Sequence, residues 1–322
     1  MEAQGISGTI KWTLDDDGTL YFTPVDGKEG TFADSKKFRF SDPWQGYEWN
    51  KFGKNIKEIK SYGKINLALF SNYMFYGCSS LTSLKGLKDW KTTNALALSN
   101  MFEFCSSLIS LDGLEDWDVS DVTDMNDMFH DCRSLNSLKS IKNWNVNDVT
   151  TMKGMFSGCS SLLSLDGLED WDVKNVRNLS QTFEYCSNLI SLNALKDWDT
   201  SKVVDMSSLF DNCSSIVTLK SLKSWNTEHV TNMQFMFNNC SSLVSLEDIK
   251  DWDTGYVLDI SFIFRNCSSL VLSRGIVKWN LKNVKTSFYS LYNCPLISTW
   301  DKTQWKVKCN MHVIAYQLKR LA

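Results

Sequence analysis

The sequence predicts an α/β repeat protein: a right-handed solenoid of 27-residue coils, with a parallel β-sheet on one face, short helices on the other and a cap at each end. Two series of residues lead to this prediction. Nine cysteines from Cys78 to Cys294 follow one another at steps of 27 residues, and eight tryptophans from Trp90 to Trp279 keep the same step. A fixed period of about 20 to 50 residues is typical of solenoids. Crossovers between parallel strands are almost always right-handed, which sets the expected hand.

The uninterrupted part of the repeat sets the domain boundaries. We expect an N-terminal cap with a β-hairpin at 1–69, the solenoid at 70–294 and a C-terminal cap at 295–322. No proline lies between the first and last cysteines of the series, so none breaks the stack. Caps are expected because the terminal coils of a solenoid would otherwise expose their apolar faces to water.

Within a coil, the spacing of apolar residues predicts a short helix before the cysteine and a short strand after it. From Val122 to Cys132 the apolar residues follow steps of 3, 3, 1 and 3, which place them on one helical face of about two turns. After the cysteine, leucines such as Leu108 and Leu111 alternate with Ser, Asp and Gly, which indicates a strand and then a turn. Trp117 then anchors the loop that returns to the next helix.

The repeated cysteines, phenylalanines and tryptophans are predicted to form buried ladders. A cysteine that recurs once per coil after Phe behaves as a small buried hydrophobe. Cysteines stacked about 5 Å apart with parallel Cβ directions seldom reach the torsion angle of a disulfide, so we expect free thiols. Cys309, outside the series, is expected to be exposed. The ladder residues include Cys105, Cys132, Cys159, Cys186, Trp117, Trp144, Trp171, Phe129 and Phe156.

Composition and motifs argue against catalysis and against several classes of ligand. The net charge is −3 and no basic run exceeds a pair of residues, which disfavours nucleic acid. No stretch of about 18 apolar residues occurs, so insertion into a membrane is not expected. His130, His229 and His312 are far apart in the repeat, and no nucleophile, phosphate-binding or metal-binding motif is present. We therefore expect a protein that is not an enzyme and binds no cofactor or metal.

A column of variable residues four positions after the cysteine is one candidate for partner binding. The column is mostly β-branched or aliphatic and includes Ile109 and Leu163. If it faces outward, it forms a hydrophobic stripe that a partner could bind. We favour a core or partly buried position for it, because outward apolar stripes are uncommon.

A second column, five positions before the cysteine, becomes aromatic in the last three coils. Its members there are Phe235, Phe262 and Tyr289, and Tyr256 lies nearby in the repeat. Aromatic residues are frequent anchors at protein interfaces, and they are equally suited to lie under a cap. We expect the C-terminal tail to fold back over them, so that Phe235 and Phe262 contact residues 298–318.

The repeat sequence resembles that of the BspA-like leucine-rich-repeat surface proteins. The phrase MFSGCSSLLSLDGLEDWDV, with VTDM before the next MF, carries the resemblance, which covers about residues 70–294. Residues 7–22 resemble the hairpin that often precedes such repeats, and Pro43 and Trp44 fit the same leading segment. The resemblance implies a leucine-rich-repeat-like solenoid that is secreted or lies at the cell surface, where it acts as an adhesin or interaction protein.

The expected function is therefore binding of a protein partner or host surface component. Two alternatives stay open: an intracellular or virion structural scaffold, which free thiols would fit, and a carbohydrate-binding surface protein. Exposed Trp or Tyr beside Asp and Asn would indicate carbohydrate, and the tryptophan series is too regular to be exposed. The N-terminus lacks the charged-then-apolar pattern of an export signal. We expect an extracellular or cell-surface location if a signal was removed, and otherwise a cytoplasmic one.

Overall fold

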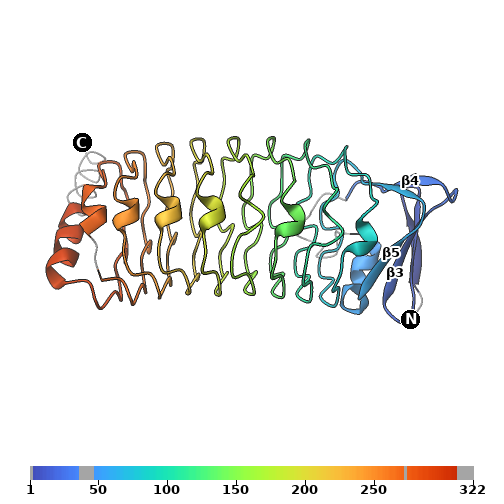
Figure 1. Ribbon diagram of the computed structural model, residues 1–322, viewed down its shortest axis with the longest axis horizontal. Coiled ribbons are helices and arrows are strands. Elements are labelled where there is room, and N and C mark those ends of the chain that lie inside the picture. The colour runs from blue at the N-terminus through green and yellow to red at the C-terminus, as the bar shows by residue number, and fades with distance from the viewer. Residues whose placement is uncertain (1–2, 36–46, 272–273, 310–322) are drawn as a thin grey trace, which may run out of the picture.

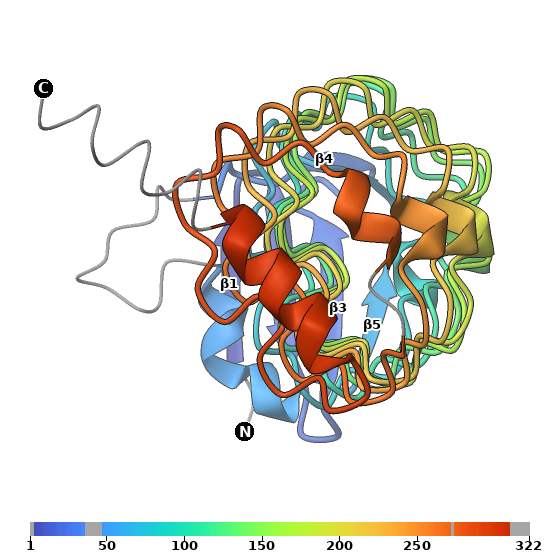
Figure 2. The same ribbon diagram turned by 90° about the vertical axis from the view of Figure 1, so that its left-hand side faces the viewer.

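The computed structural model describes residues 3–35, 47–271 and 274–309. These residues form an elongated stack of coils, with a small β-sheet at the N-terminal end and a helix at the C-terminal end (Figure 1). Seen along the stack, successive coils lie over one another (Figure 2). We name each coil after its cysteine. The leading segment expected at Pro43 and Trp44 lies outside the described residues.

The N-terminal cap contains β1 (Ala3–Ser7), β2 (Ile10–Leu14), β3 (Thr19–Pro24), β4 (Glu29–Thr31), the 3₁₀ helix η1 (Glu48–Asn55), β5 (Glu58–Ser61) and β6 (Lys64–Asn66). One sheet has the order β1-β2-β3-β5, in which β5 pairs in parallel with β3, and β4 pairs with β6 in a second sheet. The hairpin expected over 7–22 is formed by β2 and β3. The Asp15 carboxylate closes its turn by accepting the Thr19 N–H at 2.8 Å.

The coils are joined by a ladder of single parallel β-bridges. The bridges from Phe70 to Thr286 pair residues 27 positions apart, such as Asp124 with Thr151. These bridges confirm the predicted stack. The predicted parallel sheet, however, is reduced to this ladder, which lies eight residues before the cysteine. At the leucines after the cysteine, where the strand was predicted, the described residues form a single bridge, between Ser164 and Ser191.

The prediction of a helix between Val122 and Cys132 is wrong, because this segment forms consecutive turns. Alternate N–H groups donate to the next coil, as when Asp127 donates to the Lys153 carbonyl at 2.7 Å and Phe129 to the Met155 carbonyl at 2.9 Å. A helix would need those N–H groups for its own carbonyls. In every coil from Cys78 to Cys294 the residues one and five positions before the cysteine have positive φ, which interrupts right-handed helical geometry.

Short 3₁₀ helices follow the cysteine instead, where a strand and turn were predicted. They are η2 (Lys85–Leu87), η3 (Lys139–Ile141), η4 (Asn193–Leu195), η5 (Lys220–Leu222), η6 (Glu247–Ile249) and η7 (Arg274–Lys278). The Cys105 and Cys159 coils have an Asp-Gly turn at this place. Gly113 and Gly167 have φ values of 110° and 112° there, and a Cβ on either would collide with a backbone carbonyl of the preceding coil.

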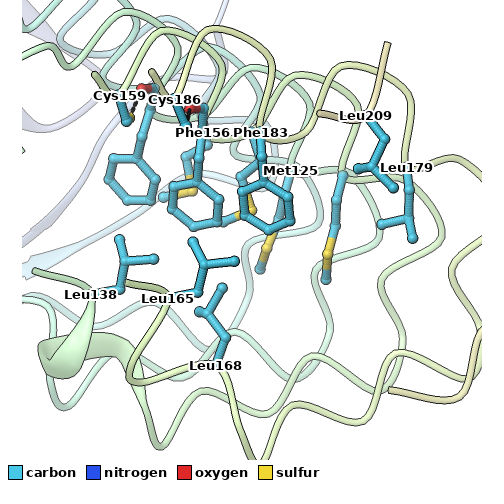
Figure 3. Packing of buried hydrophobic residues seen from close by; sticks show 14 of the residues in the cluster. Met125, Leu138, Phe156, Cys159, Leu165, Leu168, Leu179, Phe183, Cys186 and Leu209 are labelled. Carbon is cyan, nitrogen blue, oxygen red and sulfur yellow. Dashed lines mark hydrogen bonds between the residues drawn. The ribbon is translucent and has the colours of Figure 1, made fainter. Parts of the chain in front are cut away.

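The interior is a set of parallel side-chain columns, one residue of each kind per coil (Figure 3). Phe156 stacks on Phe183 with ring centroids 5.9 Å apart, and the same stacking recurs along the solenoid. The Cys186 thiol donates to the Phe156 carbonyl at 3.2 Å, and the Trp198 indole to the Leu168 carbonyl at 3.0 Å. All ten cysteines are free and buried. Every ladder residue named from the sequence is at most 3% exposed: Cys105, Cys132, Cys159, Cys186, Trp117, Trp144, Trp171, Phe129 and Phe156.

A helix over 299–309 crosses the open end of the stack (Figure 2). Trp305 is 6% exposed, its ring centroid lies 6.2 Å from that of Trp279, and its indole N–H donates to Ser290 Oγ at 2.8 Å. Cys309, the last residue of this helix, is buried, so the expectation that it is exposed is wrong. Burial raises the pKa of its thiol to about 11.

Candidate binding surfaces

The aliphatic stripe is a row of exposed residues four positions after the cysteine. Its exposed fractions run from 42% at Val244 to 59% at Leu163. This column, with Ile109 and Leu163, is therefore exposed, where a core or partly buried position was favoured. The stripe consists of Ile109, Leu163, Ile190, Val217, Val244 and Val271.

Local chain geometry explains why the stripe faces outward. Leu189, one position before Ile190, is fully buried, and successive side chains of an extended segment point to opposite sides. The Ile190 N–H donates to the Leu163 carbonyl at 3.0 Å, which keeps neighbouring coils in register at about 5 Å per step. Asn136 interrupts the stripe once. Five consecutive coils, from Leu163 to Val271, are apolar without a break.

The aromatic column, Phe235, Phe262 and Tyr289, lies along the side of the stack. Phe235 and Phe262 are half-buried and stack with ring centroids 4.5 Å apart, and Tyr289 continues the column 5.6 Å from Phe262. The Arg265 guanidinium lies 5.6 Å from the Phe262 ring centroid. Tyr289 is 60% exposed.

The C-terminal helix does not stack on this column as expected. In the described part of the tail, Trp305 contacts Trp279, and no ring of residues 298–309 stacks on Phe235 or Phe262. The expected contacts with 310–318 lie outside the described residues. The cap therefore covers the interior columns, because those are the columns that the last coil would leave open to water. Tyr256 is 62% exposed in the loop after Trp252, apart from the aromatic column in the repeat.

A third surface, the polar groove, was not predicted from the sequence. It has a volume of about 820 Å³ and crosses six successive coils, from Cys132 to Cys267. Side chains one or two positions before the cysteine and one position after it line the groove. Its principal residues are Asp131, Arg133, Glu184, Tyr185, Asn212 and Asn239.

Four asparagines form a continuous amide ladder in and beyond the groove. Asn239 Nδ2 donates to Asn212 Oδ1 at 2.9 Å, and Asn266 Nδ2 donates to Asn239 Oδ1 at 2.6 Å. Asn293 Nδ2 extends the ladder to Asn266 Oδ1 at 3.0 Å. We call Asn212, Asn239, Asn266 and Asn293 the asparagine ladder. The signal in the sequence was the Asn-Cys pair in each of the last four coils, which could have marked this column.

Burial raises the pKa of several carboxyl groups on this side of the stack. Burial raises the pKa of Asp211 to about 7, although Asn238 and Asn212 donate hydrogen bonds to its Oδ1 atom. Burial also raises the pKa of Glu103 to about 7 and raises that of Glu184. The pKa of His130 is raised chiefly by its hydrogen bond to Asp127.

Among the described residues, His, Cys, Asp and Glu side chains nowhere gather in a group of three that could hold a metal ion. The described helices include none with the length and apolar character needed to cross a bilayer.

The fold and its surfaces define an elongated repeat solenoid with exposed side-chain columns. Two overlapping matches, over residues 70–192 and 188–305, are to the family described as "Mycoplasma protein of unknown function, DUF285". The chain belongs to this family, whose description assigns no activity. No curated protein matches the sequence.

Two solved structures resemble the chain weakly. One is a leucine-rich repeat protein from Eubacterium ventriosum, with 15% identity over 91% of this chain and 95% of that one, and a TM-score of 0.33. The other is a leucine-rich cell surface protein from Faecalibacterium prausnitzii, with 14% identity over 94% and 97% and a TM-score of 0.32. Because these scores are low, the fold description rests on the chain's own bridges and contacts.

Proposed function

We propose that this chain is a non-enzymatic interaction protein that binds a protein partner through the aliphatic stripe. The observation that carries the proposal is the row of exposed aliphatic side chains in five consecutive coils, from Leu163 to Val271. Contiguous exposed apolar surface marks interaction sites on soluble proteins. At about 5 Å per coil the row is roughly 20 Å long, which suits an elongated apolar face on the partner.

The proposal includes a location and a kind of partner. The resemblance of the repeat sequence to BspA-like leucine-rich-repeat proteins supports an adhesin that is secreted or held at a cell surface. Its partner would then be a protein component of a host surface. The right-handed sense of the coils stays a prediction, on the strong preference of parallel crossovers for that hand.

A matched pair of double variants tests the stripe. Ile190→Ser with Val217→Ser changes the stripe, and Ile6→Ser with Val25→Ser makes the same chemical changes at equally exposed sites in the N-terminal cap. Partners captured from host matrix and cell-surface fractions are identified by mass spectrometry, purified, and titrated by surface plasmon resonance. We expect saturable binding that the stripe variant weakens at least tenfold and the cap variant leaves unchanged.

Two results would contradict the proposal. A purified partner that binds both double variants equally well does not use the stripe. Saturable partners found only in cytosolic fractions would favour the intracellular scaffold over an adhesin.

A further inference from the structure

Tyr185 stands in the middle of the polar groove with its ring uncovered. It is 54% exposed, and no ring contact, and no hydrogen bond to its hydroxyl group, is found among the described residues. Near the N-terminal end of the solenoid, by contrast, Tyr76 and Phe104 contact each other with ring centroids 5.5 Å apart. A free aromatic ring among polar groups can bind a ligand that has an apolar face and a polar rim.

The coil beside Tyr185 presents only small residues to the groove. They are Ser157 and Gly158, both buried, and Ser160, which is partly buried. A Cβ on Gly158 would collide with the Asp131 carboxylate, so the glycine allows that carboxylate to lie over this coil. We call this place the notch. Its two sides are the Tyr185 ring and the Asp131 carboxylate.

Hydrogen-bonding groups continue from the notch along the groove. Arg133 Nη2 lies 3.1 Å from Asp131 Oδ2, at the edge of the notch. Beyond Tyr185 the asparagine ladder and the serines after each cysteine repeat at about 5 Å, over a groove roughly 25 Å long. Each ladder amide has two N–H groups and two carbonyl lone pairs, and the ladder uses only part of them. The groove therefore offers regularly spaced donors and acceptors to a linear ligand.

The backbone and the charges of the groove disfavour peptide strands and anionic chains as ligands. The Asp131 and Tyr185 N–H groups donate to Ser157 and Asp211 carbonyls of the next coils, both at 2.7 Å. A peptide strand needs a free backbone edge to pair with, and these N–H groups are already used. Arg133 is the one Arg or Lys among the described lining residues, and it is paired with Asp131. His130, the other lining residue that can carry a positive charge, lies 3.3 Å from Asp127 Oδ1. Phosphate chains and acidic sugars would therefore meet Asp131 and Glu184 without a free positive charge to bind.

We propose that the polar groove binds a neutral carbohydrate chain, with one pyranose ring stacked on Tyr185 in the notch and the following sugar units along the asparagine ladder. A pyranose ring has a C–H face that packs on an aromatic ring and a rim of hydroxyl groups. Neighbouring hydroxyls match the two oxygens of a carboxylate, the fork of a guanidinium and a primary amide. This site is separate from the aliphatic stripe and does not depend on the protein partner proposed above.

The test is calorimetric titration of the whole chain with hexasaccharides. The neutral probes are cellohexaose, chitohexaose, maltohexaose and mannohexaose, and hexagalacturonate is the anionic probe. We expect at least one neutral probe to bind saturably and the anionic probe not to bind. Tyr185→Ala should weaken that binding at least tenfold, and Glu184→Gln should weaken it less. Tyr256→Ala is the matched control, because Tyr256 is 62% exposed outside the groove and its removal should change nothing.

Several outcomes would overturn the proposal. They are the absence of saturable binding for all four neutral probes, binding of the anionic probe alone, and equal losses in the Tyr185 and Tyr256 variants. Tyr185→Phe keeps the ring and should retain most of the affinity, which separates loss of stacking from loss of fold. The stripe variant with Ile190→Ser and Val217→Ser should still bind sugar. Sugar binding and partner binding can therefore fail separately.

Discussion

The Cys159 coil and the Cys267 coil share an interior and differ on the outside. In each, the phenylalanine three residues before the cysteine lies in the same stack, 5.9 and 5.8 Å from a neighbouring ring. The first coil has glycine at both left-handed positions, where the second has Phe262 and Asn266. One coil therefore forms the floor of the notch and the other carries an aromatic ring and an amide. The interior columns specify the fold, and the exterior columns vary without disturbing it.

The largest expected effect tests whether the two interiors are equivalent. Phe156→Ala and Phe264→Ala each remove a fully buried ring, and each should lower the free energy of unfolding by about 3–5 kcal/mol. Urea unfolding followed by tryptophan fluorescence measures both. A cost below about 1 kcal/mol for either variant would mean that its coil repacks around the gap and that the interiors differ.

The next effect concerns the buried carboxyl group of Asp211, which lies between the two compared coils. Its pKa is raised to about 7 by burial, whereas in the unfolded chain it titrates near 4. The folded chain therefore holds a proton that the unfolded chain loses. The stabilisation is complete below about pH 4 and is lost as the pH rises to about 7.

We expect the contribution of Asp211 to the free energy of unfolding to fall by a few kcal/mol between pH 4 and pH 8. Asp211→Asn should flatten that part of the pH profile, as measured by urea unfolding at each pH. Asp118→Asn is the control, because hydrogen bonds from Ser120 lower the pKa of Asp118, so that its titration lies below this pH range and the profile should keep its slope. A profile for Asp211→Asn that matches the unchanged chain would show that this carboxyl is ionised when folded.

The same contrast explains what the sequence could predict. The inward-pointing Cys, Phe and Trp residues recur at a constant step, so their period alone predicted the stack and the buried columns of Cys159 and Phe156. Residues such as Tyr185 and Gly158 do not repeat, so no period marked the groove. The role of each of these residues depends on the side chains of the neighbouring coils, which come together only in the folded stack.

The wrong local predictions have a physical cause in the same assembly. Steps of three and four residues normally indicate a helix, because a helix pairs its own N–H groups four residues apart. In this solenoid the Phe129 N–H is paired with the next coil, and turns reproduce the same spacing of apolar residues. Two left-handed residues per coil make those turns, and in some coils they are Phe235, Gln181 or Tyr289, which are not typical turn residues.

A smaller effect separates the two coils at one backbone position. Gly158 and Asn266 both precede the cysteine and have φ values of 74° and 61°. Gly158→Ala should cost about 1–2 kcal/mol, because a side chain is disfavoured in this conformation and Asp131 must move. Asn266→Gly should cost less, since glycine accepts the conformation and only the amide contacts are lost. Equal costs in urea unfolding would show that the glycine of the notch has no special role.

The smallest effect is expected in the loop after the tryptophan, where every coil of the series except the first, which has Lys91, carries Asp or Asn. Asp118 Oδ1 accepts hydrogen bonds from the Ser120 N–H at 3.1 Å and the Ser120 hydroxyl at 2.7 Å. Asn145 makes the same turn one coil later, where its Oδ1 accepts the Asn147 N–H at 3.2 Å. Because an amide oxygen serves as well as a carboxylate oxygen, Asp118→Asn should change the free energy of unfolding at pH 7 by less than about 0.5 kcal/mol. It should also leave partner and sugar binding unchanged in the titrations described above. A loss of binding without a loss of stability would show that this row of Asp and Asn side chains is itself a ligand site and not only a turn.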